Sequence, residues 1–358
     1  MIPLVAVTWL SLSSSSAQET ESWKVPRTAD GHPDLSGTYD TATLTPLQRP
    51  REFGNKLFLT AEEAEAIATK ERLLAEELGA ESDPDRDAPP EGGDGSPGPY
   101  GNVGGYNFLW IDRGTEAFEL DGKRRTSIIV DPPDGRWPTM TPEAAKRVAA
   151  RRELYKENGG ENHGEAWWLE IDGPGPYDNP EQRPLGERCL LGFGSTSGPP
   201  SLPVLYNNLK RIVQTKDHVM ILVEMVHDAR IIRLNQEHAP QEIRKWMGDS
   251  VGHWEGDTLV VDTTNFGDTP GLFYATKDLH VTERFTRIGE NAILYQFTVE
   301  DPAVWTKPWS GEYPWVVTDA PMYEYACHEA NYSFEGILRG ARLLEAEAMQ
   351  KKSERQQQ

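Results

Sequence analysis

The chain has 358 residues, of which 37% are hydrophobic, and its formal net charge at pH 7 is −21. This length allows one large domain or two ordinary ones, and an aromatic content of 9% is enough to build a core, which excludes a chain disordered throughout. The excess of carboxylates excludes nucleic acid and anionic membrane as main partners, because phosphate binding needs clustered Lys and Arg.

Much of the charge lies in one stretch of the chain. Residues 62–94 hold twelve acidic and three basic residues, so that they account for −9 of the −21. We interpret this stretch as a solvated surface segment rather than a binding face.

The N-terminus has the composition of a secretory signal. Residues 1–12 are apolar and uncharged, and the small residues Ser13 to Ala17 follow where a signal peptidase cuts. We predict a signal peptide over 1–17 and a mature protein in the periplasm or outside the cell; a disordered apolar N-terminus is the alternative. No other run approaches the roughly 20 apolar residues of a membrane span, so none is predicted.

Residues 18–105 form a predicted N-terminal arm with one helix. Thr60 can cap this helix and Glu63 stands three positions later, which is a capping box, and helix-forming residues continue to about Leu78. The following residues 82–105 are rich in Pro, Gly and Asp and predict an acidic loop.

From residue 106 the sequence predicts a β domain, 106–358, with a helical insert near 141–158 and a C-terminal helix. Ser333 is expected to cap that last helix, 334–349, whose apolar face packs across the sheet or closes one end. The predicted strands lie at 34–39, 126–130, 210–214, 218–226, 230–234, 251–254, 258–264, 280–288, 292–300 and 322–328. Their consecutive hairpins favour an antiparallel β-barrel or a sandwich over βαβ units.

Cys189 and Cys327 are the two cysteines of the chain, and their separation fits neither CxxC nor a zinc motif. In an oxidising compartment we expect one disulfide between them, which stabilises a fold by roughly 4–5 kcal/mol in the chain-entropy model. The alternative is a catalytic thiol at Cys327 beside His328. Neighbouring strand residues point to opposite faces, so that alternative is disfavoured.

Polar side chains on individual strands are the candidates for a catalytic site. Glu224 stands in a nearly apolar run, and a buried carboxylate is costly unless it is paired, protonated or hydrogen-bonded. In the hairpin 280–300, one face carries His280 and Arg284, and Glu300 follows on the partner strand. Pointing into a barrel, these side chains would supply a general base and an anion clamp; pointing outward, they are ordinary solvated positions.

Two further candidates lie near strand ends. His227 and Asp228 stand at a corner between strands, where they can orient substrate or form a dyad, or simply hold a turn with a surface salt bridge. His328, on the last predicted strand, is a second candidate base. For Glu224 the structural alternative is an ion pair with Arg230 or Arg284.

Aromatic residues concentrate in a segment that we predict to be a loop. Trp305, Trp309 and Tyr313 stand within eleven residues of one another, and with Tyr325 they can stack on an apolar or aromatic ligand. Packing against the end of the barrel is an equal alternative. No spacing supports a metal site and no cofactor motif is complete, so neither is predicted.

Five strings stand out: RTSIIVDPPDGR at 125–136, VEMVHDAR at 223–230, WMGDSVGHWEGDTLVVDTTNF at 246–266, HVTERFTR at 280–287 and EYACHEANY at 324–332. They resemble the motifs of a large family of exported bacterial proteins usually labelled hypothetical, whose last motif has Gly where Ala330 stands. The resemblance implies export and one shared architecture but no reaction. Gly37-Thr-Tyr39 is similar to the GxW opening of lipocalin-like barrels, with Tyr for Trp, which implies a lipocalin- or calycin-like barrel.

These observations favour an exported enzyme that performs cofactor-free acid–base chemistry on an apolar or aromatic small molecule in a barrel pocket. The reaction classes that fit are lyase, isomerase, cyclase and hydrolase. A periplasmic carrier of a hydrophobic ligand, and an envelope interaction protein, are the two alternatives.

Overall fold

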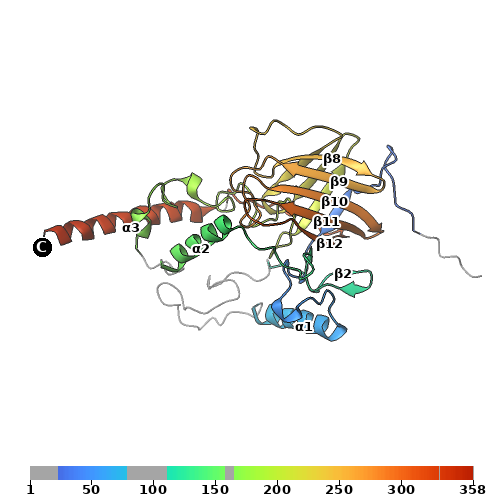
Figure 1. Cartoon of the computed structure of the whole chain (residues 1–358), viewed down its shortest axis with the longest axis horizontal. Helices are drawn as coiled ribbons and strands as arrows, with labels where there is room; N and C mark the ends of the chain where they lie inside the picture. The colour runs from blue at the N-terminus through green and yellow to red at the C-terminus, as the bar shows by residue number, and fades with distance from the viewer. Residues whose placement is uncertain (1–22, 79–110, 158–164, 330, 358) are drawn as a thin grey trace, which may run out of the picture.

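The computed structural model describes residues 23–78, 111–157, 165–329 and 331–357 (Figure 1). The predicted signal peptide, 1–17, and the predicted acidic loop, 82–105, lie outside these residues. The described part is mainly β, and its centre is a closed barrel of nine strands, which confirms the predicted barrel.

The barrel closes because its first strand pairs with its last. In spatial order the strands are β1 (Gly37–Asp40), β5 (Leu209–Gln214), β6 (His218–Val223), β7 (Ala229–Leu234), β8 (Asp249–Glu255), β9 (Thr258–Thr264), β10 (His280–Gly289), β11 (Ala292–Glu300) and β12 (Trp309–Val317). β12 then pairs with β1 through Tyr39 and Val317. All these pairings are antiparallel except β7–β8, so the barrel is mixed. β1 lies in the segment assigned to the N-terminal arm, yet it is a strand of the barrel.

Short elements complete the sheet structure. β4 (Ile129–Asp131) adds to β12, and β2 (Glu119–Leu120) pairs with β3 (Lys123–Arg124) in a separate hairpin. The described 3₁₀ turns are η1 (Arg51–Phe53), η3 (Trp167–Glu170), η4 (Pro180–Gln182) and η5 (Met225–His227).

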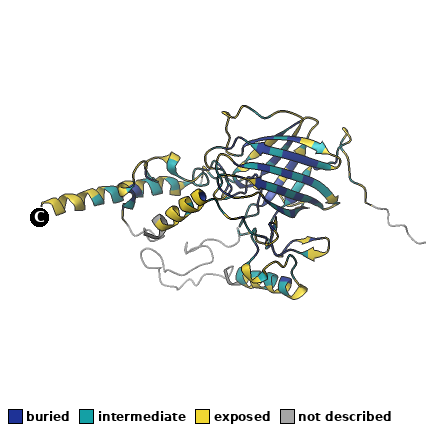
Figure 2. Cartoon of the chain, viewed as in Figure 1, coloured by how far each residue is buried: buried dark blue, intermediate teal, exposed yellow. Residues whose placement is uncertain are grey.

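Aromatic side chains are prominent in the hydrophobic core of the barrel. Figure 2 shows buried and partly buried residues alternating along its strands. Alternate residues of a strand point to opposite faces, so β11 directs its apolar set inward while its polar set faces out. Tyr295 lies at the centre of this core, with ring centroids 5.0 Å from Phe285, 4.9 Å from Trp315 and 5.5 Å from Tyr313. The interior is therefore packed by rings rather than open.

Two predictions near the C-terminus are wrong. The aromatic segment predicted as a loop forms β12, which contains Pro314. The Glu312 N–H donates to the Ile128 carbonyl, on the side of β12 away from β11. The backbone nitrogen of Pro314, two residues on, faces the same side. It lies in the gap between β4 and β1, where no neighbouring strand requires a hydrogen bond from β12. The predicted strand 322–328 is absent, and that segment runs across one end of the barrel.

The three described α-helices lie outside the barrel (Figure 1). α1 (Ala61–Leu78) begins with the predicted capping box: the Glu63 N–H donates to Thr60 Oγ1 at 3.2 Å and the Thr60 N–H to Glu63 Oε2 at 2.7 Å. α2 (Pro142–Glu157) begins where the sequence predicts.

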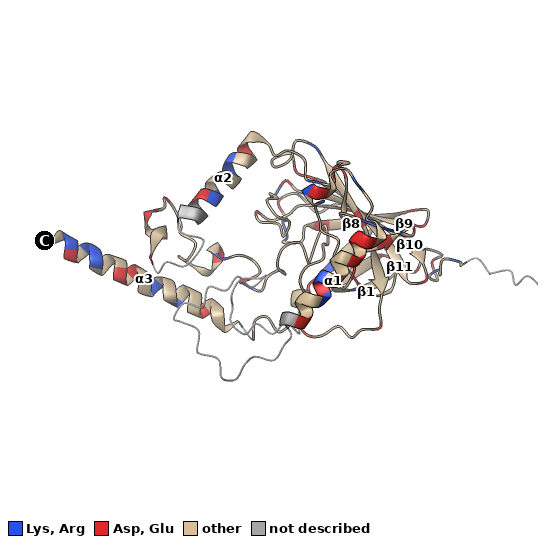
Figure 3. Cartoon of the chain, turned by 90° about the horizontal axis from the view of Figure 1, so that it is seen from below, with Lys and Arg blue, Asp and Glu red and all other residues tan. Residues whose placement is uncertain are grey.

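α3 (Tyr332–Gln356) confirms the predicted C-terminal helix, but its expected packing on the barrel is wrong. It leads away from the barrel, with charges of both signs along it (Figure 3). Ala341 packs with Ala166 and Trp168, and the Trp168 Nε1–H donates to Glu345 at 2.7 Å. The apolar face of α3 is therefore covered by the segment around η3.

We expect Gly311→Ala in β12 to lower the free energy of unfolding by about 1–3 kcal/mol, because overpacking a core displaces its neighbours. A Cβ at Gly311 would lie 2.4 Å from Cζ of the buried Phe297. Gly289→Ala is the matched control, since nothing lies within 4 Å of its added Cβ. Urea denaturation measures both, and equal stabilities of the two variants would contradict the packing described here.

Candidate functional site

A buried ion pair crosses the barrel interior. Arg230 on β7 and Glu283 on β10 are 5% and 0% exposed, and the guanidinium donates to both carboxylate oxygens at 2.5 and 3.0 Å. The same carboxylate accepts a hydrogen bond from the Tyr295 hydroxyl at 2.8 Å. Such bidentate geometry, with a further hydrogen bond to the carboxylate, is what lets two charges remain in an apolar interior.

The loop 192–201 closes this end of the barrel, and its residues from Ser195 onward are buried. The Ser201 N–H donates to the Tyr295 hydroxyl at 2.9 Å, and the Tyr313 hydroxyl donates to the Ser201 carbonyl at 2.8 Å. Two tyrosines of the barrel thus hold the loop in the opening as a plug.

Lys210 on β5 is fully buried beneath this plug. Its ammonium donates to the Thr196 carbonyl at 2.8 Å, and no ion pair within 4 Å includes it among the described residues. Burial lowers the pKa of Lys210 to about 7, with nearby Arg230 acting in the same direction and Glu224 and Asp228 opposing it. The amine is therefore part neutral at neutral pH.

Asp228 stands on the other side of the same plug. Its Oδ2 accepts the Ser197 hydroxyl at 3.0 Å, and burial raises the pKa of the Asp228 carboxyl. A lysine with a lowered pKa and a carboxyl with a raised one thus share one end of the barrel. Groups perturbed in this way gather at functional sites more often than elsewhere.

The turn that carries Asp228 is strained. Val226 and His227 have φ values of 64° and 54°, and a β-branched residue in the left-handed region is an outlier. This turn ends β6 at Val223, so Glu224 lies in the turn and not on the strand that the sequence predicts.

Glu224 and His227 hold the segment that crosses the barrel end. Glu224, 5% exposed, accepts the Tyr323 N–H at 3.0 Å, and His227 Nε2 accepts the Tyr325 N–H at 2.9 Å. The predicted partners of Glu224 are engaged elsewhere, since Arg230 pairs with Glu283 and Arg284 with Glu255. Both predicted catalytic residues thus bind backbone of this chain.

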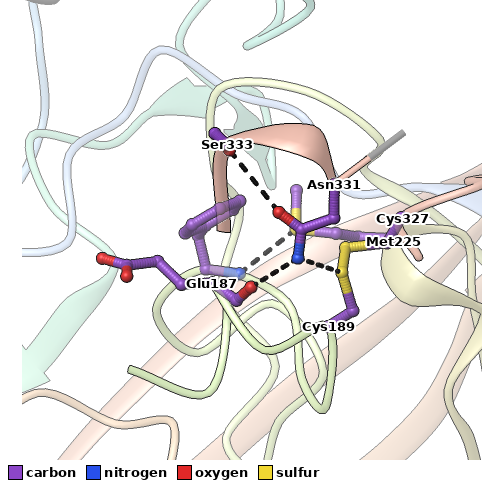
Figure 4. Close-up of a disulfide and its surroundings, with 7 residues drawn as sticks. Glu187, Cys189, Met225, Cys327, Asn331 and Ser333 are labelled. Carbon is purple, nitrogen blue, oxygen red and sulfur yellow. Dashed lines mark hydrogen bonds between the residues drawn. A yellow bond between two sulfur atoms is a disulfide. The ribbon is translucent and has the colours of Figure 1, made fainter. Parts of the chain in front are cut away.

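The predicted disulfide joins Cys189 to Cys327 and ties the crossing segment to the plug side of the barrel (Figure 4). The Asn331 amide beside it donates to the Glu187 carbonyl at 2.7 Å. His328, next in the chain, is exposed. The segment is therefore fixed at three points, by Glu224, by His227 and by the disulfide.

The predicted polar face of the hairpin 280–300 points out of the barrel, so the solvated alternative holds there. His280 Nε2 lies 2.6 Å from Asp262, Arg284 pairs with Glu255 at 2.7 Å, and Glu300 is 3.9 Å from His280 Nδ1. None of these side chains meets the group formed by Lys210 and Asp228.

Of the four aromatic residues predicted to bind a ligand, three are buried and one is partly exposed. Trp305, Trp309 and Tyr313 are at most 2% exposed, so they belong to the core. Tyr325 lies partly exposed in the crossing segment. Packing against the barrel, the alternative weighed for this segment, describes the three buried rings.

Sequence reasoning missed Lys210, Glu283 and Tyr295. A signal for Glu283 exists, because it stands between Val281 and Phe285 on the apolar face of its strand, where an unpaired charge is not tolerated. Lys210 likewise lies on the buried face of its strand, together with Ile212. A charged residue on the apolar face is a stronger indication of a buried site than one on the polar face.

The fold and the site define a β-barrel protein with buried ionisable side chains, Lys210 and the Arg230–Glu283 pair, near an end closed by the plug loop. Comparison with family models, with curated proteins and with solved structures finds no match. Within the described residues, no helix has the length and apolar character needed to cross a membrane.

We expect Glu283→Gln to destabilise the fold by about 3–5 kcal/mol, because it leaves the Arg230 charge buried without its partner. The double variant Arg230→Met, Glu283→Leu removes both charges and should recover most of the loss. Glu255→Gln, which breaks the exposed pair with Arg284, is the surface control and should change little. Chemical denaturation compares them, and a Glu283→Gln variant as stable as Glu255→Gln would refute the role of the ion pair.

The His280 cluster should make a small, pH-dependent contribution to stability. Its hydrogen bond with Asp262 raises the pKa of His280 above 6.5, so the stabilisation is complete below pH 6.5 and is lost as pH rises through the raised pKa. We expect His280→Gln to cost less than about 1 kcal/mol at pH 5.5, given its exposure to solvent, and still less at pH 9. Unfolding free energies at the two pH values test this, with the exposed His218→Gln as control; a cost that grows with pH contradicts it.

Proposed function

We propose that this protein is an acid–base enzyme whose reacting groups are the Lys210 amine and the Asp228 carboxyl at the plugged end of the barrel. The observation that carries the proposal is the pair of opposed pKa shifts: about 7 for Lys210 and raised for Asp228. Opposed shifts give one group that accepts a proton and one that donates a proton near neutral pH.

The chemistry that suits this pair is a proton shift within one small molecule. The Asp228 carboxylate, whose raised pKa makes it a stronger base, takes a proton from one atom of the substrate, and the Lys210 ammonium, whose lowered pKa makes it a stronger acid, returns one to another atom. The substrate loses one proton and gains one, so its composition is unchanged. Proton exchange between Asp228 and Lys210 then restores the starting protonation states of the two side chains. An isomerase or a cyclase is therefore favoured, and no cofactor is required for this step.

Access to the amine depends on the plug. Loop 192–201 covers Lys210, and it contains Gly194 and Gly198 with φ values of 60° and 73°, a conformation in which glycine is unstrained. Displacing this loop opens the barrel end to a ligand, and the rings of Tyr295 and Tyr313 then line its floor. These rings suit an apolar or aromatic substrate.

The packed interior disfavours the alternative of a carrier. A carrier of a hydrophobic ligand needs an enclosed apolar cavity, whereas the described barrel interior is filled by Tyr295, Phe285 and Trp315. The apolar N-terminus over 1–17 and the disulfide support an exported protein, since disulfides persist in oxidising compartments.

Lys210→Met tests the proposal. We expect the wild-type chain, incubated with a bacterial metabolite extract and followed by mass spectrometry, to deplete a compound while an isomer of equal mass accumulates. Lys210→Met should lose this conversion by at least about a hundredfold, the scale of one general acid–base group. It should remain folded, because methionine suits the buried site better than a charge does.

Lys216→Met is the matched control, because Lys216 is exposed in the turn after β5. It should convert the extract as the wild type does. The rate should follow a bell-shaped pH profile whose upper limb falls near pH 7, the pKa of Lys210. Conversion by folded Lys210→Met at the wild-type rate, or no conversion by the wild type, would overturn the assignment.

A further inference from the structure

A cleft of about 830 Å³ lies on the outside of the barrel. The segment 114–121 forms one wall, and the outer faces of β11 and β12 form the other. The cleft runs over the gap between β1 and β4, where the side of β12 away from β11 has no neighbouring strand. Its volume is within the range of small-molecule sites.

Apolar side chains line the barrel side of this cleft. Val316 and Ile288 are 48% and 44% exposed, and Leu294 and Pro314 lie between them and the buried Phe118. The outer face of a barrel in water is ordinarily polar, as it is around His280 and Arg284. An apolar surface enclosed on two sides has the character of a site for a hydrocarbon body.

The lining also has an excess of negative charge. Glu116 and Glu312 are neutralised by Arg124 and Arg125, but among the described residues no ion pair includes Asp40, Glu119 or Asp121. Asp40 is half-buried, and burial, with Asp112 and Glu224 nearby, raises the pKa of its carboxyl. A positive charge placed at Asp40 would be stabilised there.

Arg125 neutralises a second carboxylate in the wall of the cleft. Its side chain is 10% exposed, and its Nη2 pairs with Glu312 at 2.5 Å. The carboxylate of Asp40 has no such partner among the described residues. The lining therefore offers a carboxylate without an ion pair beside an apolar wall.

We propose that this cleft is a binding site for a small organic amine, with its ammonium at Asp40 and its hydrocarbon body on Leu294, Pro314 and Val316. Neither of the reacting groups proposed above, Lys210 and Asp228, lines this cleft.

Calorimetric titration of the full chain with three phenylpropyl compounds tests the proposal. 3-Phenylpropylamine carries the cation, 3-phenylpropanol is its neutral counterpart, and 3-phenylpropanoate is its anion. We expect saturable binding of the amine, binding of the alcohol weaker by about five- to tenfold, and no measurable binding of the anion. Equal affinity for amine and alcohol, or no saturable binding of the amine, overturns the proposal.

Two variants locate the site. Asp40→Asn removes the charge while keeping an acceptor for the Ala42 N–H, and should weaken amine binding by about five- to tenfold. Val316→Lys, at an exposed position, places a like charge on the apolar wall and should abolish it. Asp30→Asn changes net charge equally at an exposed position outside the cleft and should bind as the wild type does. Unchanged binding in both cleft variants places the amine elsewhere and refutes the assignment.

Discussion

The bidentate ion pair between Arg230 and Glu283 governs how the barrel interior is built. The two charges come from β7 and β10, which are separated by two strands around the ring, so the pair spans the interior and fixes the two walls relative to one another. Buried charges need further hydrogen bonds to satisfy their remaining polar atoms. Tyr295 meets one carboxylate oxygen, and through Tyr295 the plug loop is held in place. Lys210, buried beneath this loop, has its pKa lowered by burial and, to a smaller extent, by the nearby charge of Arg230.

Local signals of the sequence predicted local structure well. The capping box at Thr60 and Glu63 is complete within four residues, and the alternation along β10 and β11 is enough to define a hairpin. β12 was missed because the segment around Pro314, considered alone, has the composition of a loop. Its proline is tolerated only because the seam between β1 and β4 leaves that edge without a partner, which is a property of the closed barrel and not of the segment.

The candidate site shows the same division. Glu224 was found because charge in an apolar run is visible in sequence, and Asp228 because it stands at a corner between two predicted strands. Lys210 was not, since its relation to Asp228 depends on how β5, the strained turn and the plug meet in space. For the hairpin face with His280 and Arg284, the sequence left two alternatives open, catalytic if it points inward and solvated if it points outward. Which way a strand face points depends on how the whole sheet closes, and the pattern of a single strand does not determine that.

Closure of the barrel by β1 has a consequence for the order in which the chain folds. β1 precedes α1, and its neighbours β5 and β12 come from the middle and the end of the chain. During synthesis β1 emerges early but has no complete pairing until β12 has appeared, so the ring cannot close around its core on a growing chain. Contacts of such long sequence separation fold slowly. Local hairpins such as β10–β11 can pair earlier, but the aromatic face of the open sheet stays uncovered until β12 has joined β1, the condition in which a chain can aggregate or be captured by a chaperone.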